Sequence, residues 1–400
     1  MQKSLVGILT LLVLSACSRT LSEDSVAVRD SAGVSIVTNT TTQLAAVSRW
    51  NLGEEPALEI SPNRTSEYVL YEVTRVLPLP NGELAVLNSG AFEVLVLDSD
   101  GRLVTRIGGE GDGPGEFKRP NSLFLAPPDS FGVFDSGHRR LSVFDRNGVL
   151  GREITLESRG EGSVGERLLP LASGDLVVAT WPGFGEGSRE GPYRPESEYY
   201  RISRDGAKQA DYGMFPGSEV FANRTAMGGV LFGPTTHAAT KGNLLVVGTS
   251  EKTELRVYDP DGTLASLIRW PDSNRTLSEE RVDSFMKIAL STVPESAQPQ
   301  TRDFLSAFPM SEEVPAYGEV LASEEGFIWV GPPQGPEVTN FEIPPAAGRW
   351  LVFNSDGTLV ASIETPEGFE PLSIRGEQVF GIFVDEMGVE SVRVHEIEKD

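Results

Sequence analysis

The sequence predicts an all-β fold: a six-bladed β-propeller of four-stranded antiparallel blades, closed by an N-terminal strand and interrupted by a short helical insertion. Three observations lead to this prediction. A β-rich segment with a polar turn recurs along the 400 residues, further strands surround each copy, and one N-terminal strand has no unit of its own. A four-stranded unit repeated radially is the architecture of a β-propeller.

The recurring segment is a run of β-branched and aromatic residues followed by a turn that ends in glycine. Five copies align without gaps: VLVLDSDG (94–101), LSVFDRNG (141–148), YYRISRDG (199–206), LRVYDPDG (255–262) and WLVFNSDG (350–357). Asp or Asn before Gly, after such a run, is a strong hairpin signal. A sixth, more degenerate copy is SVRVHEI at 391–397.

Two further strands precede the copies, and one follows most of them. The strands directly upstream are NGELAVLN (81–88), DSFGVFD (129–135), SGDLVVAT (173–180), GNLLVVGT (242–249), EGFIWVG (325–331) and GEQVFGIF (376–383). The clearest innermost strands are VTRVLPL (73–79), NSLFLAP (121–127) and RLLPLA (167–172). Runs such as LVTRI follow the polar turns. The unit is therefore four strands, from the innermost to the outermost.

The sixth unit lacks its outermost strand, because the chain ends three residues after Ile397. An open ring would expose a strand edge, and exposed edges invite aggregation. The N-terminal segment GVSIVTN (33–39) has the composition of a strand and belongs to no unit. We therefore expect Val34 to Thr38 to pair with Ser391 to Ile397 and close the ring.

The longest connection is expected to carry a helix at about 276–291. Thr276 and Glu279 have the spacing of a capping box. An apolar stripe follows at three- and four-residue spacing, made of Val282, Phe285, Met286 and Ala289. Such a helix either packs on the ring as a lid or brace, or binds a partner.

The N-terminus predicts a lipoprotein leader. Residues 1–17 read MQKSLVGILTLLVLSAC, with an early lysine, an apolar run and the only cysteine of the chain, Cys17. The ending LSAC resembles the lipobox of bacterial lipoproteins, which implies cleavage before Cys17 and acylation of its thiol. We therefore expect a signal peptide at 1–16, a tether at 17–30 and the propeller at 31–400. Because Ser18 is not aspartate, the enterobacterial sorting rule implies a lipid anchor in the cell envelope, at the outer membrane.

The charge of the chain argues against nucleic acid as a partner. The formal net charge is −24, from 34 basic and 58 acidic residues. Such a surface repels phosphate backbones, and no lysine- or arginine-rich block offsets it.

The glycine-rich stretch IGGEGDGPGEFKRP at 107–120 matches no known ligand loop. It lacks the Lys-Ser or Lys-Thr that must follow the last glycine of a Walker loop, the third glycine of a dinucleotide fingerprint and the alternating oxygen ligands of a calcium loop. We interpret it as a connector whose glycines permit a sharp turn. Phe117 would anchor it, and Glu110 and Asp112 would be solvated and replaceable.

Together with the strands that follow, residues 107–148 resemble an NHL-type repeat, in which a glycine-rich run and a proline precede the innermost strand. The whole mature chain looks like the bacterial six-bladed propeller lipoproteins of NHL or TolB-like type. The resemblance implies a structural polar pair between Asp135 and Arg140.

Strand direction places the long connections on one face, which we call the loop-rich face. The other face carries tight turns such as PNGE and DPDG and is called the turn face. The long segments are 107–120, 156–166, 180–198, 212–235, 271–316 and 331–349. Loops on a rigid scaffold commonly carry binding sites. We therefore expect a non-catalytic binding or interaction module that recognises an envelope protein, a peptide or a glycan through the loop-rich face.

The candidate ligand-binding residues are aromatic side chains of these loops and polar residues near the starts of innermost strands. They are Trp181, Phe184, Tyr193, Phe341, Asn121 and His237. Aromatic side chains in loops can stack on sugars or hold peptides, or they can fix their own loop to the scaffold. Trp329 and Trp350 lie in strand patterns and are expected in the core.

No catalytic residue and no cofactor is expected from the motifs. The three histidines lie far apart, and neither HExxH nor GxSxG occurs. The alternative is a calcium-dependent lactonase or esterase, because six-bladed enzymes of that type hold calcium at the channel mouth with acidic and amide side chains. Its candidate ligands are Glu67 (or Glu72), Asn121, Glu166, Glu319 and Glu370.

Overall fold

The computed structural model describes residues 26–61, 67–126, 130–156, 164–181, 191–222, 227–333, 335–336 and 345–399. Four of the sequence predictions fall outside these residues: the leader peptide, Cys17, Phe184 and Phe341. For Trp181 and Glu166 only the backbone is described, and both lie in strands.

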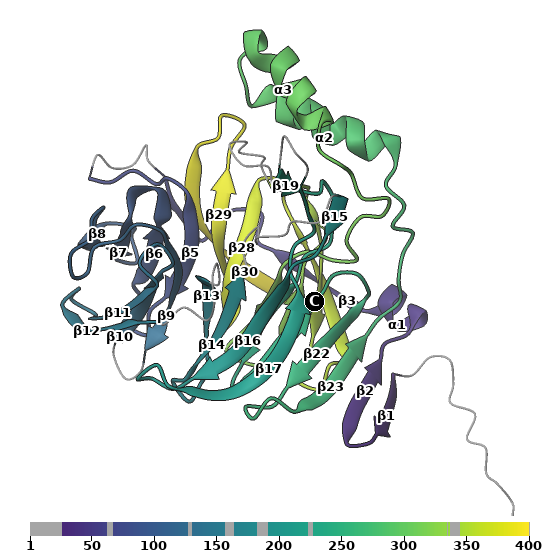
Figure 1. The fold of residues 1–400 in the computed structure, drawn as a ribbon, viewed down its shortest axis with the longest axis horizontal. Coiled ribbons are helices and arrows are strands. Elements are labelled where there is room, and N and C mark those ends of the chain that lie inside the picture. Colours follow the sequence, from purple (N-terminus) through teal and green to yellow (C-terminus); the bar gives the residue numbers. More distant parts are fainter. Residues whose placement is uncertain are drawn as a thin grey trace, which may run out of the picture.

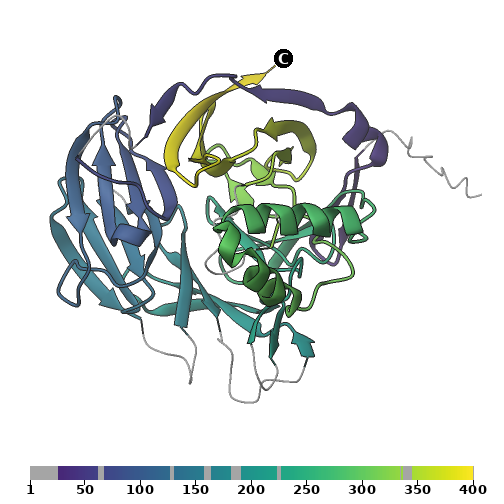
Figure 2. The ribbon, with the colours of Figure 1, turned by 90° about the horizontal axis from the view of Figure 1, so that it is seen from above.

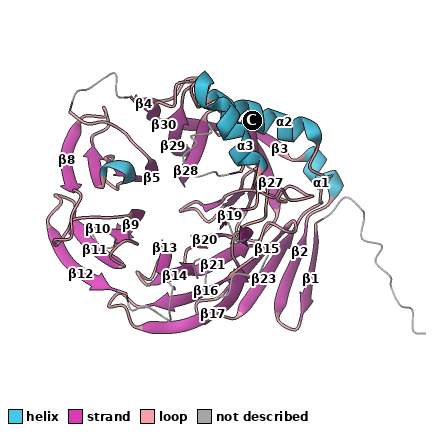
Figure 3. Ribbon diagram, turned by 45° about the horizontal axis from the view of Figure 1, so that its top comes forward, coloured by secondary structure: helices cyan, strands magenta, loops and turns pink. Residues whose placement is uncertain are grey.

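The protein is a six-bladed β-propeller, as predicted, with its blades arranged in a ring (Figures 1 and 3). Blade 1 comprises β5 (Val73–Pro78), β6 (Leu84–Asn88), β7 (Glu93–Leu97) and β8 (Leu103–Gly108). Blade 2 comprises β9 (Pro120–Ala126), β10 (Ser130–Asp135), β11 (Arg140–Asp145) and β12 (Leu150–Thr155). Blade 3 comprises β13 (Val164–Pro170), β14 (Leu176–Trp181), β16 (Glu196–Ile202) and β17 (Lys208–Pro216).

The second half of the ring repeats this arrangement. Blade 4 comprises β20 (His237–Lys241), β21 (Leu244–Gly248), β22 (Glu254–Tyr258) and β23 (Leu264–Arg269). Blade 5 comprises β24 (Val320–Ala322), β25 (Ile328–Val330), β26 (Gly348–Phe353) and β27 (Leu359–Thr365). Blade 6 comprises β28 (Phe369–Arg375), β29 (Gln378–Val384), β30 (Glu390–Lys399) and β4 (Leu58–Ile60).

The polar turns form as the sequence predicts, and blade 1 shows how. Asp98 accepts hydrogen bonds at Oδ1 from the N–H groups of Asp100 and Arg102, at 2.9 and 2.8 Å. Gly101 closes the turn with φ +79°, in the left-handed region that favours glycine. The side chain and the glycine together return the chain into the outermost strand.

The hydrophobic core lies between the blades, with one cluster of buried residues at each boundary. Because both faces of a blade pack on a neighbour, middle strands such as β7 are buried along their whole length. Trp329 and Trp350 are each 2% exposed in the cluster between blades 5 and 6. Their predicted place in the core is confirmed.

The N-terminal residues 27–60 run along the outer rim of three blades, and we call them the N-terminal strap (Figure 2). The strap contains β1 (Ala27–Ser31), β2 (Val34–Thr38), the helix α1 (Thr41–Ala46), β3 (Ser48–Leu52) and β4. Strand β2 pairs in parallel with β23 of blade 4, and β3 pairs in parallel with β27 of blade 5. Strand β4 then pairs antiparallel with β30 and completes blade 6.

Closure of the ring by an N-terminal strand is therefore confirmed, but the predicted strand is wrong. Val34–Thr38 lies on blade 4, and Leu58–Ile60 pairs with the C-terminal strand instead. Asn39 explains the position of β2. Its side chain donates to the carbonyls of Arg269 and Gly357 and accepts from the N–H of Leu359, which ties the strap to blades 4 and 5.

The helical insertion lies above the ring, on the loop-rich side (Figures 1 and 2). It contains α2 (Glu279–Ser291), the short 3-10 helix η3 (Glu295–Ala297) and a second α-helix that the sequence did not predict, α3 (Gln298–Ser306). The cap of α2 is Ser278, whose hydroxyl accepts the N–H of Arg281, so the predicted capping role of Thr276 is wrong. The predicted stripe of α2 is confirmed, since it packs against Leu305 of α3 and Leu231 of the preceding loop.

Two smaller elements complete the fold. A three-stranded sheet of β15 (Gly191–Tyr193), β18 (Val220–Ala222) and β19 (Met227–Gly229) joins two of the long connections, which lie on the same face as predicted. The 3-10 helix η2 (Ser89–Ala91) links β6 to β7.

Candidate binding site in the central channel

The innermost strands line a channel that holds two adjoining cavities. The upper cavity has a volume of about 470 Å³ and lies toward the loop-rich face, near the first residues of the innermost strands. The lower cavity has a volume of about 400 Å³ and lies toward the turn face, near the last residues of the same strands. Both are lined by Arg75, Arg167, Leu169 and Ala238. These four residues therefore form the waist of the channel.

Irregular strand pairing brings polar side chains to the waist. In β5, Val73 pairs with Asn88 and Arg75 pairs with Leu87, so Thr74 is an extra residue in the ladder. A bulge of this kind changes the direction of neighbouring side chains, and Thr74 and Arg75 both line the upper cavity. Strand β13 has the same irregularity immediately before Arg167.

Arg167 belongs to a charged group with two residues of other blades. Its Nη1 lies 3.3 Å from Oε1 of Glu319, and Nδ1 of His237 lies 3.1 Å from Oε2 of the same carboxylate. Burial alone would raise the pKa of Glu319. The charge of Arg167, the hydrogen bond from His237 and the charge of Arg75 outweigh burial, so the pKa lies well below its ordinary value. Glu319 is therefore a carboxylate at neutral pH.

Arg75 has no carboxylate partner among the described residues. Its Nη1 donates a hydrogen bond to the carbonyl of Thr74, at 2.5 Å. Burial and the charge of Arg167 lower the pKa of Arg75 to about 10, against the opposing effect of Glu319 and Glu370. At neutral pH the guanidinium remains charged, so the waist carries two cations.

The upper cavity is polar and positively charged. Besides the two arginines, its polar lining residues are Thr74, Asn121, Ser197, Ser218, Thr235 and Thr236. No aspartate or glutamate is among the described residues that line it. In a chain with a net charge of −24, this cavity is complementary to an anion that also carries hydrogen-bonding groups.

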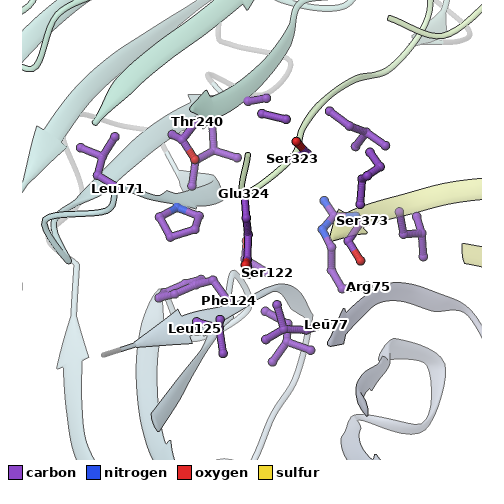
Figure 4. A pocket seen from close by; sticks show the side chains of 18 of the residues that line it. Arg75, Leu77, Ser122, Phe124, Leu125, Leu171, Thr240, Ser323, Glu324 and Ser373 are labelled. Carbon is purple, nitrogen blue, oxygen red and sulfur yellow. The ribbon is translucent and has the colours of Figure 1, made fainter. Parts of the chain in front are cut away.

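The lower cavity is mainly aliphatic and aromatic. Figure 4 shows Leu77, Phe124, Leu125 and Leu171 around it, together with Arg75 at the waist. At the turn-face end, Glu324 forms an ion pair with Arg375, with 3.2 Å between Oε2 and Nε. The two cavities thus differ in chemistry although they share the waist.

The structure brings some of the sequence-predicted residues to the channel and separates others. Asn121 lines the upper cavity, and Glu370 lies in β28, an innermost strand. His237 and Glu319 contact each other but line neither cavity. Tyr193 lies in β15 of the small insertion sheet rather than in the channel.

Glu67 is not near the innermost strands, so its predicted position is wrong. Its carbonyl accepts a hydrogen bond from Nη2 of Arg106, which belongs to the outermost strand of blade 1. Glu72, the alternative to Glu67, is exposed. In the described part of the chain, no three His, Cys, Asp or Glu side chains are grouped so that they could hold a metal ion.

The glycine-rich connector between blades 1 and 2 is anchored by Phe117, as predicted. The ring is fully buried and meets that of Phe144 edge-on, with 6.1 Å between centroids. Gly108 has φ +88°, and a Cβ at this position would approach the Phe117 ring to 2.3 Å. Glycine is therefore required here by both the backbone and the packing.

Asp112 is solvent-exposed, as predicted, with 86% of its side chain accessible, but it also has a partner. Its Oδ1 lies 2.8 Å from Nε2 of His138, whose Nδ1 lies 2.8 Å from Oδ2 of Asp135. The predicted side-chain pair of Asp135 with Arg140 is wrong. Asp135 accepts backbone N–H groups of the connector, whereas Arg140 pairs with Glu153 at 3.2 Å. These contacts give Asp135, His138 and Arg140 a structural role in holding the connector.

The two waist arginines were missed by the sequence reasoning, although a signal existed. Both lie in the motif Arg-x-Leu-Pro-Leu, at residues 75–79 and 167–171. An arginine that recurs at the same position of two innermost strands faces the same channel in both blades. Predictions based on acidic, aromatic and histidine side chains do not include this arginine.

Comparisons with known proteins support the fold. A family model, DUF5128, described as a 6-bladed beta-propeller, matches residues 62–159, which include blades 1 and 2. Among curated protein sequences, none is significantly similar to this chain. Within the described residues, every helix is too short or too polar to cross a bilayer.

Solved structures resemble this chain over most of its length at low identity. A protein of Bacteroides fragilis that is predicted to be exported has 13% identity and a TM-score of 0.51, over 91% of this chain and 99% of that one. A DUF4221 family member from Bacteroides vulgatus has 12% identity and a TM-score of 0.56, over 88% and 99%. A gluconolactonase from Xanthomonas campestris reaches a TM-score of only 0.41, at 12% identity over 88% and 98%, so it carries no argument about activity. The similarities concern the fold alone.

Proposed function

We propose that this six-bladed propeller is a lipid-anchored protein of the cell envelope that binds a ligand without converting it, through the cavity that opens toward its loop-rich face. The observation that carries this proposal is the upper cavity itself. It combines a volume of about 470 Å³ with hydrogen-bonding side chains from several blades, within the range of small-molecule sites in proteins.

The positions of the titratable groups support binding rather than catalysis. A general base must reach the proton that it removes. His237 and Glu319 are bound to each other, and neither lines either of the two channel cavities. The cations of the waist can hold an anionic ligand in place, and the described residues that line the upper cavity include no histidine, aspartate or glutamate that could act as a general base.

A thermal-shift experiment with a blocked cavity tests the proposed site. Residues 18–400, which retain every described residue, are screened against a panel of neutral, acidic and basic small molecules. Ser218→Trp places a large side chain at an exposed position in the cavity lining. Its matched control is Ser99→Trp, in an exposed tight turn of blade 1.

We expect at least one compound to stabilise the wild-type chain and the Ser99→Trp variant but not the Ser218→Trp variant. Binding of a native-state ligand raises the melting temperature by mass action. Equal stabilisation of all three proteins would contradict the proposed site, and conversion of a bound compound into a product would contradict the non-catalytic role.

The lipid anchor rests on the N-terminal sequence, with Cys17 as the acylated residue. Several acyl chains bind a membrane far more firmly than one. The Cys17→Ser variant is therefore expected to remain unprocessed or to leave the membrane fraction, and in cells with two membranes the wild type should fractionate with the outer one. A Cys17→Ser variant that fractionates like the wild type would refute the anchor.

The calcium-dependent hydrolase is the less favoured alternative. Glu319, one of its proposed ligands, already faces the charge of Arg167 and the hydrogen bond from His237. A calcium ion at this carboxylate would be repelled by the guanidinium groups of the waist. The geometry therefore favours an anion over a cation in the channel.

A further inference from the structure

We propose that the ligand of the upper cavity is a small carboxylate that also carries hydroxyl groups, such as a sugar acid, and that Arg75 and Arg167 hold its carboxylate at the waist of the channel. This inference rests on the proposed function, because it names the class of ligand for the same cavity.

The charge distribution is the first argument. The chain has 58 acidic and 34 basic residues, so its surface as a whole repels anions. The upper cavity reverses this sign, with two arginines and no carboxylate among its described lining residues. A cation pair in a narrow, partly desolvated space interacts with an anion more strongly than exposed lysines do. The positive charge is therefore a local property of the upper cavity and not of the chain as a whole.

The state of Arg75 is the second argument. A guanidinium in a partly desolvated position costs free energy unless an anion compensates it. The burial of Arg75 and the like charge of Arg167 already destabilise its protonated form. No carboxylate of the described residues lies within ion-pair distance of Arg75 to compensate for this. A ligand carboxylate between the two arginines would supply the missing negative charge.

Arg167 can take part without giving up Glu319. Its Nη1 and Nη2 lie 3.3 and 3.4 Å from a single oxygen, Oε1 of Glu319. A guanidinium has five N–H donors, so one loosely bound carboxylate oxygen leaves donors for a second anion. Glu319 meanwhile keeps Arg167 oriented and compensates part of its charge, which allows the site to release its ligand.

The hydroxyl groups of the lining determine the rest of the ligand. Ser197, Ser218, Thr235 and Thr236 lie on the loop-rich side of the arginines. The hydroxyl oxygens of Ser218 and Thr235 lie 2.6 Å apart, within hydrogen-bond distance of each other. Hydroxyl groups both donate and accept hydrogen bonds, as sugar hydroxyls do. The chain of an aliphatic acid would form no hydrogen bonds with these groups and would fit the lower cavity better.

Isothermal titration calorimetry with matched compounds tests the inference. The probes are D-galacturonate, D-galactose and hexanoate, and the protein is the chain from residue 18 onward. Galacturonate and galactose differ in one carboxylate, whereas hexanoate retains the carboxylate without the hydroxyl groups. The variants are Arg75→Gln, Arg75→Lys and, as a control, Arg102→Gln in an exposed turn of blade 1.

We expect galacturonate to bind the wild type and the Arg102→Gln variant, and to bind Arg75→Gln at least about tenfold more weakly because a charge-assisted pair is lost. Arg75→Lys keeps the charge without the planar fork and should bind with intermediate affinity. The Arg75→Lys variant also provides the test if the Arg75→Gln variant does not fold. Galactose and hexanoate should bind at least about tenfold more weakly than galacturonate.

Other results would overturn the inference and distinguish it from the proposed function. If galactose binds as well as galacturonate and Ser218→Trp abolishes both, the carboxylate is irrelevant but the site stands. If hexanoate binds best and Ser218→Trp has no effect, the ligand occupies the lower cavity and both proposals fail. If none of the probes binds, the inference is refuted, and the broader panel decides the proposed function.

Discussion

Substitution of Asn39 by alanine tests whether the N-terminal strap lies on blades 4 and 5. Asn39 is 2% exposed, and its side chain makes three hydrogen bonds to the backbone. Nδ2 donates to the carbonyls of Arg269 and Gly357 at 3.0 Å each, and Oδ1 accepts from the N–H of Leu359 at 2.8 Å. The alanine variant leaves buried backbone groups unpaired, so we expect the free energy of unfolding to fall by roughly 2 to 4 kcal/mol.

Urea denaturation followed by circular dichroism measures this loss, with Asn81→Ala as the matched control. Asn81 lies in an exposed turn of blade 1, where its side chain accepts one long hydrogen bond of 3.3 Å. Its substitution should change stability by less than about 0.5 kcal/mol. If the two variants unfold at the same urea concentration, Asn39 does not hold the strap and the reasoning fails.

Three further perturbations test other parts of the molecule. Phe117→Ala should lower the free energy of unfolding by roughly 3 to 5 kcal/mol, because the ring is fully buried. Glu110→Asn, at an exposed position, should change it by less than about 0.5 kcal/mol. Equal denaturation midpoints for the two variants would refute the anchoring role of Phe117. Millimolar calcium should leave the melting temperature unchanged, and a rise of several degrees would restore the metal-dependent alternative. The hydrogen bond to Asp112 raises the pKa of His138, burial opposes this, and Asp135 adds to it. A histidine whose pKa is raised on folding stabilises the folded state at a pH below the unfolded pKa of about 6.5, and this stabilisation is lost as the pH rises. The difference in free energy of unfolding between the wild type and the His138→Gln variant should therefore be larger near pH 5.5 than near pH 8.5. A difference that is constant with pH, or larger at about pH 8.5, would contradict this prediction.

The blades were predictable because their signals are local. In blades 1 to 5 the third strand ends in a turn with glycine in the left-handed conformation, as at Gly101 and Gly148, and composition reveals such turns. Burial of Phe117 and of the α2 stripe follows equally from local pattern. The repeat also required an N-terminal strand for closure, since the last unit is one strand short.

The identity of that strand was not predictable, because every outermost strand offers a similar free edge. Val34–Thr38 has the better strand composition, yet the three-residue strand Leu58–Ile60 closes blade 6. The choice depends on contacts distant in sequence, such as the pairing of Asn39 with Leu359 across 320 positions. Parallel pairing of β2 and β3 with other blades adds contacts that local patterns do not encode.

The candidate site was predictable only in part, for a similar reason. The loop-rich face and Asn121 follow from strand direction. The waist arginines depend on bulges in the innermost strands, which decide whether one or two successive side chains face the channel. Glu319 could be read as a calcium ligand until the structure showed Arg167 and His237 beside it.

Hydrogen–deuterium exchange tests the central claim, that the protein binds its ligand in the upper cavity, most directly. The chain from residue 18 onward is compared with and without D-galacturonate, or the panel compound that stabilises it most. We predict slower exchange in the peptides that contain Thr74, Asn121, Ser197, Ser218 and Thr236, because a bound ligand restricts opening of the backbone around it. Protection confined to the tight turns at 98–101 and 259–262, or to the helical insertion, would contradict the claim.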